Sequence, residues 1–129
     1  MYKSKYCEVN YIDAKDAILC KWLQKCSAEE YRKPLEYGLE LLKMTNATTW
    51  ITDTTNGFES DAEDTEWLLE EFIPQTIASE CKRVVFIIAQ DSPLKEEIDE
   101  QSKALSEYFE VLQVESLEEI ENYKKESHS

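Results

Sequence analysis

Polar residues that could form a binding site follow two short apolar segments of the chain, residues 48–53 and 84–89. If both segments are parallel strands, their carboxyl ends lie at one edge of a sheet, which is where open α/β sheets bind ligands. The residues expected at this edge are Asp53, Thr54, Thr55, Asn56, Ser60, Gln90, Asp91, Ser92 and Glu115. We therefore predict that a ligand or partner binds at a polar, acidic edge of the sheet.

Phosphate-containing ligands fit this edge poorly. A phosphate site needs glycines that let backbone amides approach the anion. The chain has only Gly38 and Gly57, and it contains neither Gly-x-Gly-x-x-Gly nor Gly-x-x-x-x-Gly-Lys-Ser/Thr. We expect no nucleotide cofactor.

Nucleophilic catalysis also lacks its usual residues. A reactive Ser or Cys needs a nearby base, and the only histidine, His128, lies in the polar C-terminal tail. The cysteines contain no Cys-x-x-Cys pair, and no zinc-like ligand set accompanies them; they are Cys7, Cys20, Cys26 and Cys81. We expect no catalytic residue and no bound metal.

Asp53 ends its predicted strand, where a response-regulator receiver holds the carboxylate that accepts a phosphoryl group. A receiver also needs an acidic pair after its first strand, to hold magnesium, and a lysine after its last. Neither is present here, where the last strand is followed by Glu115. We therefore expect Asp53 to cap the turn that follows it, by accepting hydrogen bonds from the amides of residues 54–57.

Three tryptophans could line an apolar pocket or pack in the core. Trp22 and Trp50 lie in predicted strands, and Trp67 lies on the apolar stripe of a predicted helix. Aromatic side chains supply much of the surface that apolar ligands contact, but they more commonly fill the core. Both interpretations stay open, and Trp50 and Trp67 are the candidates for a pocket between sheet and helix.

The charge of the chain limits its partners. Twenty-eight acidic and fourteen basic residues give a net charge of −14, spread along the whole chain. This charge repels nucleic acid and anionic membrane surfaces, so we expect neither as a partner. It favours a strongly solvated surface or, as the sharper alternative, a basic partner protein. No apolar window reaches the roughly 18 residues of a membrane helix, and we expect a cytoplasmic protein.

The elements that must position these residues follow from periodicity. Residues 6–12 and 17–23 predict an antiparallel hairpin, and three further strands are predicted at 48–53, 84–89 and 111–114. Three helices are predicted to begin at Ser–x–x–Glu capping boxes, Ser27 with Glu30, Ser60 with Glu63 and Ser116 with Glu119, and one at Ser92. Pro34 predicts a kink in the first helix, or a start near Lys33.

The expected fold is α/β in the order ββαβαβαβα, a five-stranded, mixed, mainly parallel sheet flanked by four helices. The continuous apolar run 84–89 predicts a central strand with helices on both faces. We expect one domain over residues 1–126 and a disordered tail over 127–129.

Several segments of the chain are similar to those of a known family. The segments are Thr49-Trp50-Ile51-Thr52-Asp53, Glu66-Trp67-Leu68, Phe72-Ile73-Pro74, Lys82-Arg83-Val84-Val85-Phe86-Ile87 and Val114-Glu115-Ser116-Leu117-Glu118-Glu119. Together they resemble the SpoIIAA-like proteins, small bacterial STAS-type domains. The resemblance implies a non-enzymatic regulatory or binding module, in a superfamily whose members bind proteins, nucleotides or hydrophobic ligands.

The phosphorylation motif of that family is absent in its usual form. Anti-sigma-factor antagonists carry a phosphorylatable serine in an Asp-x-Ser setting, whereas this chain has Asp53-Thr54-Thr55. We expect a cytosolic STAS-like interaction or regulatory domain, whose partner is a protein. The alternative is a carrier of a small apolar ligand, with its pocket between sheet and helices. A homodimer also stays open.

The capping box at Ser60 makes a prediction for stability. Ser60→Ala removes a side-chain acceptor for the first amides of the helix, so it should lower the free energy of unfolding by about 1 kcal/mol. Thermal denaturation measures this change. An unchanged midpoint would place the start of the helix elsewhere.

Overall fold

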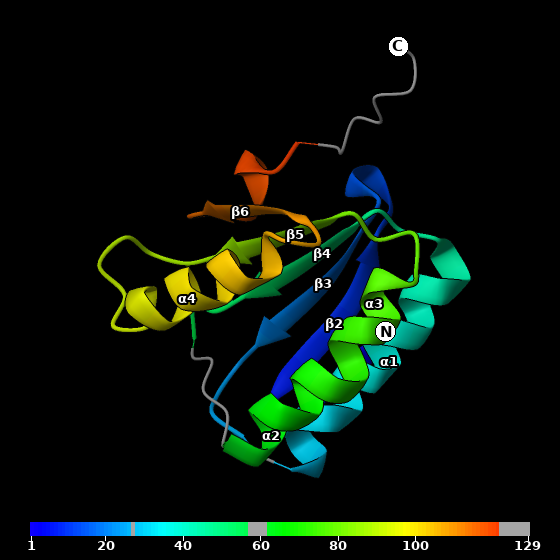
Figure 1. Ribbon diagram of the computed structural model, residues 1–129, viewed down its shortest axis with the longest axis horizontal. Helices are drawn as coiled ribbons and strands as arrows, with labels where there is room; N and C mark the ends of the chain where they lie inside the picture. The colour runs from blue at the N-terminus through cyan, green and yellow to red at the C-terminus, as the bar shows by residue number, and fades with distance from the viewer. Residues whose placement is uncertain (27, 57–61, 122–129) are drawn as a thin grey trace.

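The chain folds as a mixed six-stranded sheet with helices, and the computed structural model describes residues 1–26, 28–56 and 62–121 (Figure 1). The strands follow one another across the sheet in chain order. They are β1 Tyr2–Lys3, β2 Cys7–Ile12, β3 Ala17–Trp22, β4 Thr49–Asp53, β5 Arg83–Ile87 and β6 Glu110–Val114. The first three are antiparallel, and β3 to β6 are parallel. The α/β class and the mixed, mainly parallel sheet are thus confirmed.

The helical segments are α1 Glu29–Thr45, α2 Ala62–Trp67, the π-helical η2 Leu68–Phe72, α3 Ile73–Ile77, α4 Lys95–Leu105, and the two short 3-10 turns η1 Asp13–Lys15 and η3 Leu117–Glu119. Because α2, η2 and α3 are consecutive, they form one continuous helical stretch. The π-segment has a local cause. Pro74 has no amide to donate, and its ring clashes with the carbonyl four residues earlier. The helix widens just before it, where the amide of Ile73 donates to the carbonyl of Leu68, five residues back.

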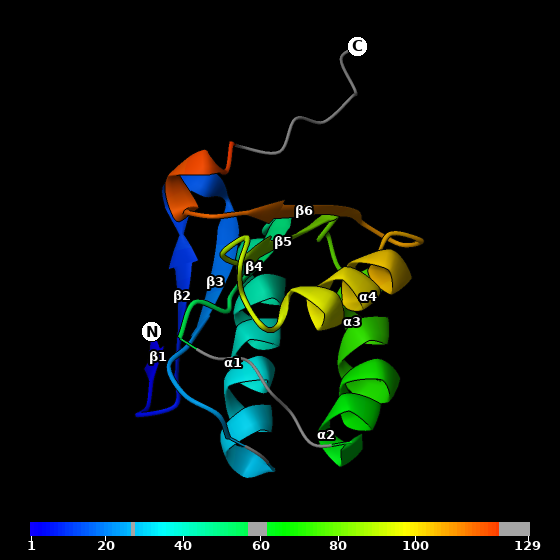
Figure 2. The same ribbon diagram turned by 90° about the vertical axis from the view of Figure 1, so that its left-hand side faces the viewer.

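All the long helices pack on one face of the sheet (Figure 2). Side chains of this face, among them Val9, Ile18, Trp50, Val84 and Phe86, share one core with residues of every long helical segment, namely Tyr31, Leu35, Leu39, Leu42, Phe72 and Ile98. From β3 onward each crossover moves one strand further in the same direction. Crossovers of one hand that advance in one direction must return on the same side of the sheet.

The opposite face is closed by the segment after β6. Ile120 is 2% exposed and packs in a second, smaller core with Ala17, Ile51, Val85 and Ile87. Lys15 fixes this segment, because its Nζ donates to the Ile120 carbonyl at 2.7 Å. Among the described residues no long helix covers this face, so the prediction of helices on both faces is confirmed for one face only. Strand β5 is buried on both faces as predicted, yet it lies next to β6, second from that edge of the sheet, and not at the centre.

Several predicted boundaries also change. The short edge strand β1 was not predicted, so the sheet has six strands where five were expected. Helix α1 begins at Glu29 and includes Pro34, so the predicted start near Lys33 is wrong. Helix α4 begins at Lys95, two residues later than predicted. After Ser116 the described chain forms only a 3-10 turn. Ser27, Ser60 and residues 122–129, with the predicted domain end and tail, lie outside the described residues.

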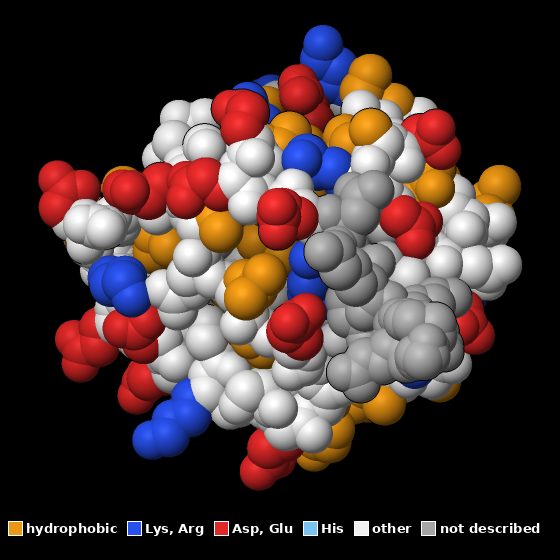
Figure 3. All heavy atoms as spheres, turned by 90° about the horizontal axis from the view of Figure 1, so that it is seen from above, with side chains coloured by type: hydrophobic (Ala, Val, Ile, Leu, Met, Phe, Trp, Pro, Cys, Tyr) orange, Lys and Arg blue, Asp and Glu red, His pale blue; other side chains and the backbone are white. Residues whose placement is uncertain are grey.

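Acidic side chains are spread over the face seen from above in Figure 3, with exposed apolar side chains between them. This distribution agrees with the net charge of −14. Within the described ranges, no helix is long and apolar enough to cross a membrane.

Gly38 allows α1 to lie against the sheet, and this contact gives a stability prediction. A Cβ at this position would lie against Cη2 of Trp50 and 2.9 Å from its Cζ3. Replacing glycine by alanine inside a helix normally stabilises it by about 1 kcal/mol. Here Gly38→Ala should instead lower the free energy of unfolding by about 1–3 kcal/mol, through overpacking. Chemical denaturation measures both the sign and the size.

Trp50→Phe, which shortens the opposing ring, is the matched second variant. If the clash is the cause, the double variant should be less destabilised than the sum of the two single variants. Strict additivity would contradict the contact.

Candidate functional site

The predicted polar edge at the ends of β4 and β5 is largely used by the fold itself. Thr54 is only 3% exposed. Its amide and its Oγ1 both donate to the Ile87 carbonyl, at 3.0 and 2.8 Å, which ties the end of β4 to β5. Asp53 Oδ1 accepts a hydrogen bond from the Thr55 amide at 2.9 Å, so the predicted turn cap is confirmed. Neither Asp53 nor Thr54 points to ligand chemistry beyond these bonds.

The segment after β5 contributes Ile88 and Gln90 to a hollow. Gln90 lines a polar hollow of about 270 Å³ at the ends of β5 and β6, with Gln113, Glu115 and Glu119. Asp91 is exposed and is not among the lining residues. Ser92 precedes α4, and its Oγ accepts the amide of Leu94 at 3.1 Å. The residues predicted at this edge therefore do not converge on one site.

The Lys95 ammonium group, which lines this hollow, already donates hydrogen bonds to other side chains of the protein. Lys95 Nζ donates to Asp99 Oδ1 at 2.7 Å and to Gln113 Oε1 at 2.8 Å. Gln113 Nε2 in turn donates to the same Asp99 oxygen at 2.9 Å. The hydrogen bonds from Lys95 and Gln113 lower the pKa of Asp99 below its usual value. This network holds the start of α4 on β6.

Between the sheet and the helices lies a small apolar cavity of about 50 Å³. Trp22 and Trp50 line it, together with Phe72 and Phe109. Trp22 stacks on Tyr31 with ring centroids 5.3 Å apart, and Trp50 meets Phe72 edge-on at 5.1 Å. A cavity of this size admits a few water molecules and is far below the roughly 300 Å³ at which ligand pockets begin. Trp22 and Trp50 are thus core residues.

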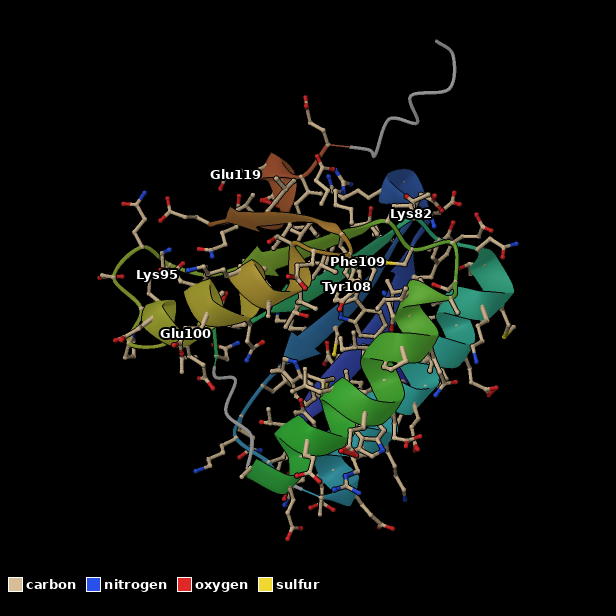
Figure 4. The ribbon with its side chains drawn as sticks, viewed as in Figure 1. Lys82, Lys95, Glu100, Tyr108, Phe109 and Glu119 are labelled. Atoms are coloured by element: carbon tan, nitrogen blue, oxygen red, sulfur yellow. The ribbon has the colours of Figure 1, made fainter. Side chains whose placement is uncertain are left out.

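A much larger groove opens on the outer side of these helices, between η2 and the C-terminal end of α4. Its volume is about 760 Å³. Its apolar lining consists of Leu68, Leu69, Ile73, Ala104, Leu105 and Tyr108, and its polar lining of Thr65, Glu100, Gln101, Lys103 and Glu107. Leu69 and Tyr108 are both more than half exposed, at 56% and 57%. In Figure 4, Tyr108 lies where the end of α4 approaches the α2–α3 stretch.

A buried carboxylate positions one wall of this groove. Asp64 in α2 is 2% exposed. Its Oδ2 accepts the Ala28 amide at 3.0 Å, and its Oδ1 accepts Arg32 Nε at 3.2 Å. The guanidinium of Arg32 also lies 5.6 Å from the centre of the Trp67 ring, which is half-buried. Asp64 therefore joins the start of α1 to the stretch that carries the groove.

The π-segment decides which side chains of that wall reach the groove. Phe72 is 4% exposed and packs inward against Trp50, whereas Leu68, Leu69 and Ile73 line the groove. A π-turn adds one residue to a helical turn, and such insertions are common at functional sites. The wall thus presents apolar side chains on its inner and its outer side.

The cysteines do not form a reactive centre. Burial raises the pKa of Cys20 well above its usual value, and it raises those of Cys26 and Cys81 to about 11. A raised pKa lowers the thiolate fraction at neutral pH, and the thiolate is the nucleophile. The Sγ atoms of Cys7 and Cys20 lie 3.6 Å apart in the core. In the described part of the chain, no group of three His, Cys, Asp or Glu side chains is arranged to hold a metal ion.

The groove was not predicted from the sequence, although two signals for it were present. Trp67, Leu68, Leu69, Phe72 and Ile73 form a broader apolar surface than a single stripe facing the core requires. The adjacent aromatic pair Tyr108-Phe109 is a second sign, since Phe109 is buried and its neighbour is not. Ser60, the remaining predicted site residue, lies outside the described residues.

Comparison of the chain with protein-family models, curated proteins and solved structures finds no match.

Asp64 provides a test of how the groove wall is held. Asp64→Ala removes the acceptor of both the Ala28 amide and Arg32, so it should lower the free energy of unfolding by about 2–3 kcal/mol. Urea denaturation measures the loss. The matched control is Glu66→Ala, which removes an exposed carboxylate from the same helix and should change stability by less than about 0.5 kcal/mol. Equal effects of the two variants would contradict the assigned role of Asp64.

Proposed function

We propose that this protein is a non-catalytic interaction module that binds a partner protein in the groove between η2 and α4. The observation that carries the proposal is the exposure of Leu69 and Tyr108 beside an apolar groove of about 760 Å³. Exposed apolar surface that is contiguous and rimmed by polar residues is typical of interaction sites. Burying two side chains that are now more than half exposed would contribute a favourable free energy to binding.

The polar groups elsewhere support a binding role more than a catalytic one. Lys95, Asp99 and Gln113 bond to one another, and Thr54 bonds to the sheet. The described thiols with shifted pKa values are shifted away from reactivity. A cytosolic location, a regulatory role and a relationship to the SpoIIAA-like proteins remain predictions from the sequence. The partner polypeptide could also be a second copy of this chain.

A carrier of a small apolar ligand is the second candidate. The small cavity lined by Trp50 is too small for this role, but the volume of the groove lies within the roughly 300–1,000 Å³ of typical ligand sites. Both candidates therefore use the same surface. The mass of the bound species separates the two candidates, because a module binds a polypeptide and a carrier binds a small molecule.

Native mass spectrometry of the protein, purified gently from the cells that make it, tests the proposal. We expect a complex with a second polypeptide that persists in the control Met44→Asp and is lost in Leu69→Asp. Met44 is 79% exposed on α1 and is not a groove residue, so this control adds the same charge at an exposed apolar position.

The other outcomes of this experiment separate the two candidates. A small molecule that is lost only with Leu69→Asp would establish the carrier in place of the module. A bound polypeptide that Leu69→Asp leaves in place would overturn the groove as the binding site.

A further inference from the structure

We infer that the occupant of the groove is an amphipathic α-helix of the partner whose apolar face is flanked by Lys or Arg. This inference rests on the proposed function and specifies the partner of the same site. Two independent features carry it, the hydrogen-bonding state of the groove walls and the charge of their side chains.

The backbone of the groove walls has little left to offer a partner. Both walls are helical, η2 on one side and α4 on the other. At the end of α4, the amide of Ser106 bonds to the Ser102 carbonyl, and those of Tyr108 and Phe109 bond to the Leu105 carbonyl. An extended peptide would therefore bury amides and carbonyls without backbone partners, which is costly. A helix satisfies its own backbone groups and can present apolar side chains alone.

Charge determines what should flank those apolar side chains. The stretch from Ala62 to Ile77 carries five acidic side chains and no basic one, but Asp64 is buried against Arg32 and none of the five is a lining residue of the groove. On the other wall, Glu100 and Glu107 line the groove with Lys103 as its one basic lining residue. Lys95, the other basic residue of α4, is already bonded to Asp99. Basic flanks on the incoming helix would therefore be attracted to Glu100 and Glu107 on the α4 wall, whereas acidic flanks would be repelled by them.

The groove presents apolar residues on both of its walls. Leu69 on one wall and Tyr108 on the other are the exposed anchors, and Leu68, Ile73 and Leu105 form the half-buried lining between them. A helix that lies in such a groove presents residues i, i+3 or i+4, and i+7 to it. The inference thus specifies both the conformation and the charge pattern of the partner segment.

Three fluorescent synthetic peptides test it by anisotropy. The first is an amphipathic Leu/Lys helix of about 18 residues, the second replaces every Lys by Glu, and the third reorders the Leu/Lys composition into strict alternation, which favours a strand. We expect the Leu/Lys helix to bind at least tenfold more tightly than either of the other two. Its affinity should fall as the salt concentration rises from 50 to 300 mM, because exposed charges are screened (about 10 Å screening length near 0.1 M).

Matched variants separate the groove from the overall negative charge of −14. The double variant Glu100→Lys/Glu107→Lys changes the charge at the groove, and Glu36→Lys/Glu40→Lys makes the same change on exposed positions of α1. We expect the groove pair to weaken binding of the Leu/Lys helix at least fivefold more than the α1 pair. Leu69→Asp should weaken it at least tenfold relative to Met44→Asp.

Each other outcome is decisive. Equal losses from the two charge pairs would show non-specific attraction and overturn the inference, as would tight binding of the alternating peptide or no binding of any peptide. If the Leu/Glu helix binds as well as the Leu/Lys helix and Leu69→Asp weakens both, the inference fails while the proposed groove stands. If Leu69→Asp changes neither peptide binding nor the native complex, the proposed function fails as well.

Discussion

From β3 to β6, every connection of this chain moves one strand further in the same direction across the sheet, and the rest of the structure depends on that constraint. All crossover helices must then return on one face. That face becomes crowded, so α1 approaches the sheet closely enough that only glycine fits at position 38, opposite Trp50. The α2–α3 stretch and α4 lie over the same face, and the space left between their outer surfaces is the groove. The opposite face has no helix among the described residues and is closed by Ile120.

Local pattern was enough to predict strands β2 to β6, although not the short edge strand β1. The alternation around Cys7 and Val9 matches their complete burial, and the apolar run from Val84 to Ile87 matches a strand covered on both faces. What covers the second face could not be predicted, because a strand packed under a helix and one packed under an irregular segment both need the same apolar residues. The start of α1 was predicted too late because of Pro34. Packing of α1 on the sheet outweighs the loss of the one backbone hydrogen bond that proline removes.

The candidate site was harder to predict than the fold, because it depends on which elements meet in space. Asp64 reads in the sequence as one of several carboxylates that favour a helix N-terminus. In the folded protein it is buried and bonds to residues about thirty positions earlier in the chain. Thr54 is the reverse case. Its position at a strand end predicted contact with a ligand, but in the folded protein its amide and its hydroxyl both donate to the backbone of β5. Tyr108 becomes a groove residue only through the placement of α4 beside η2.

The packing of Ile120 on the face opposite the long helices has a practical consequence for handling the protein. A polypeptide cut short before that residue would expose Ala17, Ile51, Val85 and Ile87 as a bare apolar sheet surface, next to the edge strand β6. Bare sheet surface beside an uncovered edge is what intermolecular strand pairing needs in order to grow. Proteolytic cleavage before Ile120 would thus be expected to make the remaining polypeptide prone to aggregation.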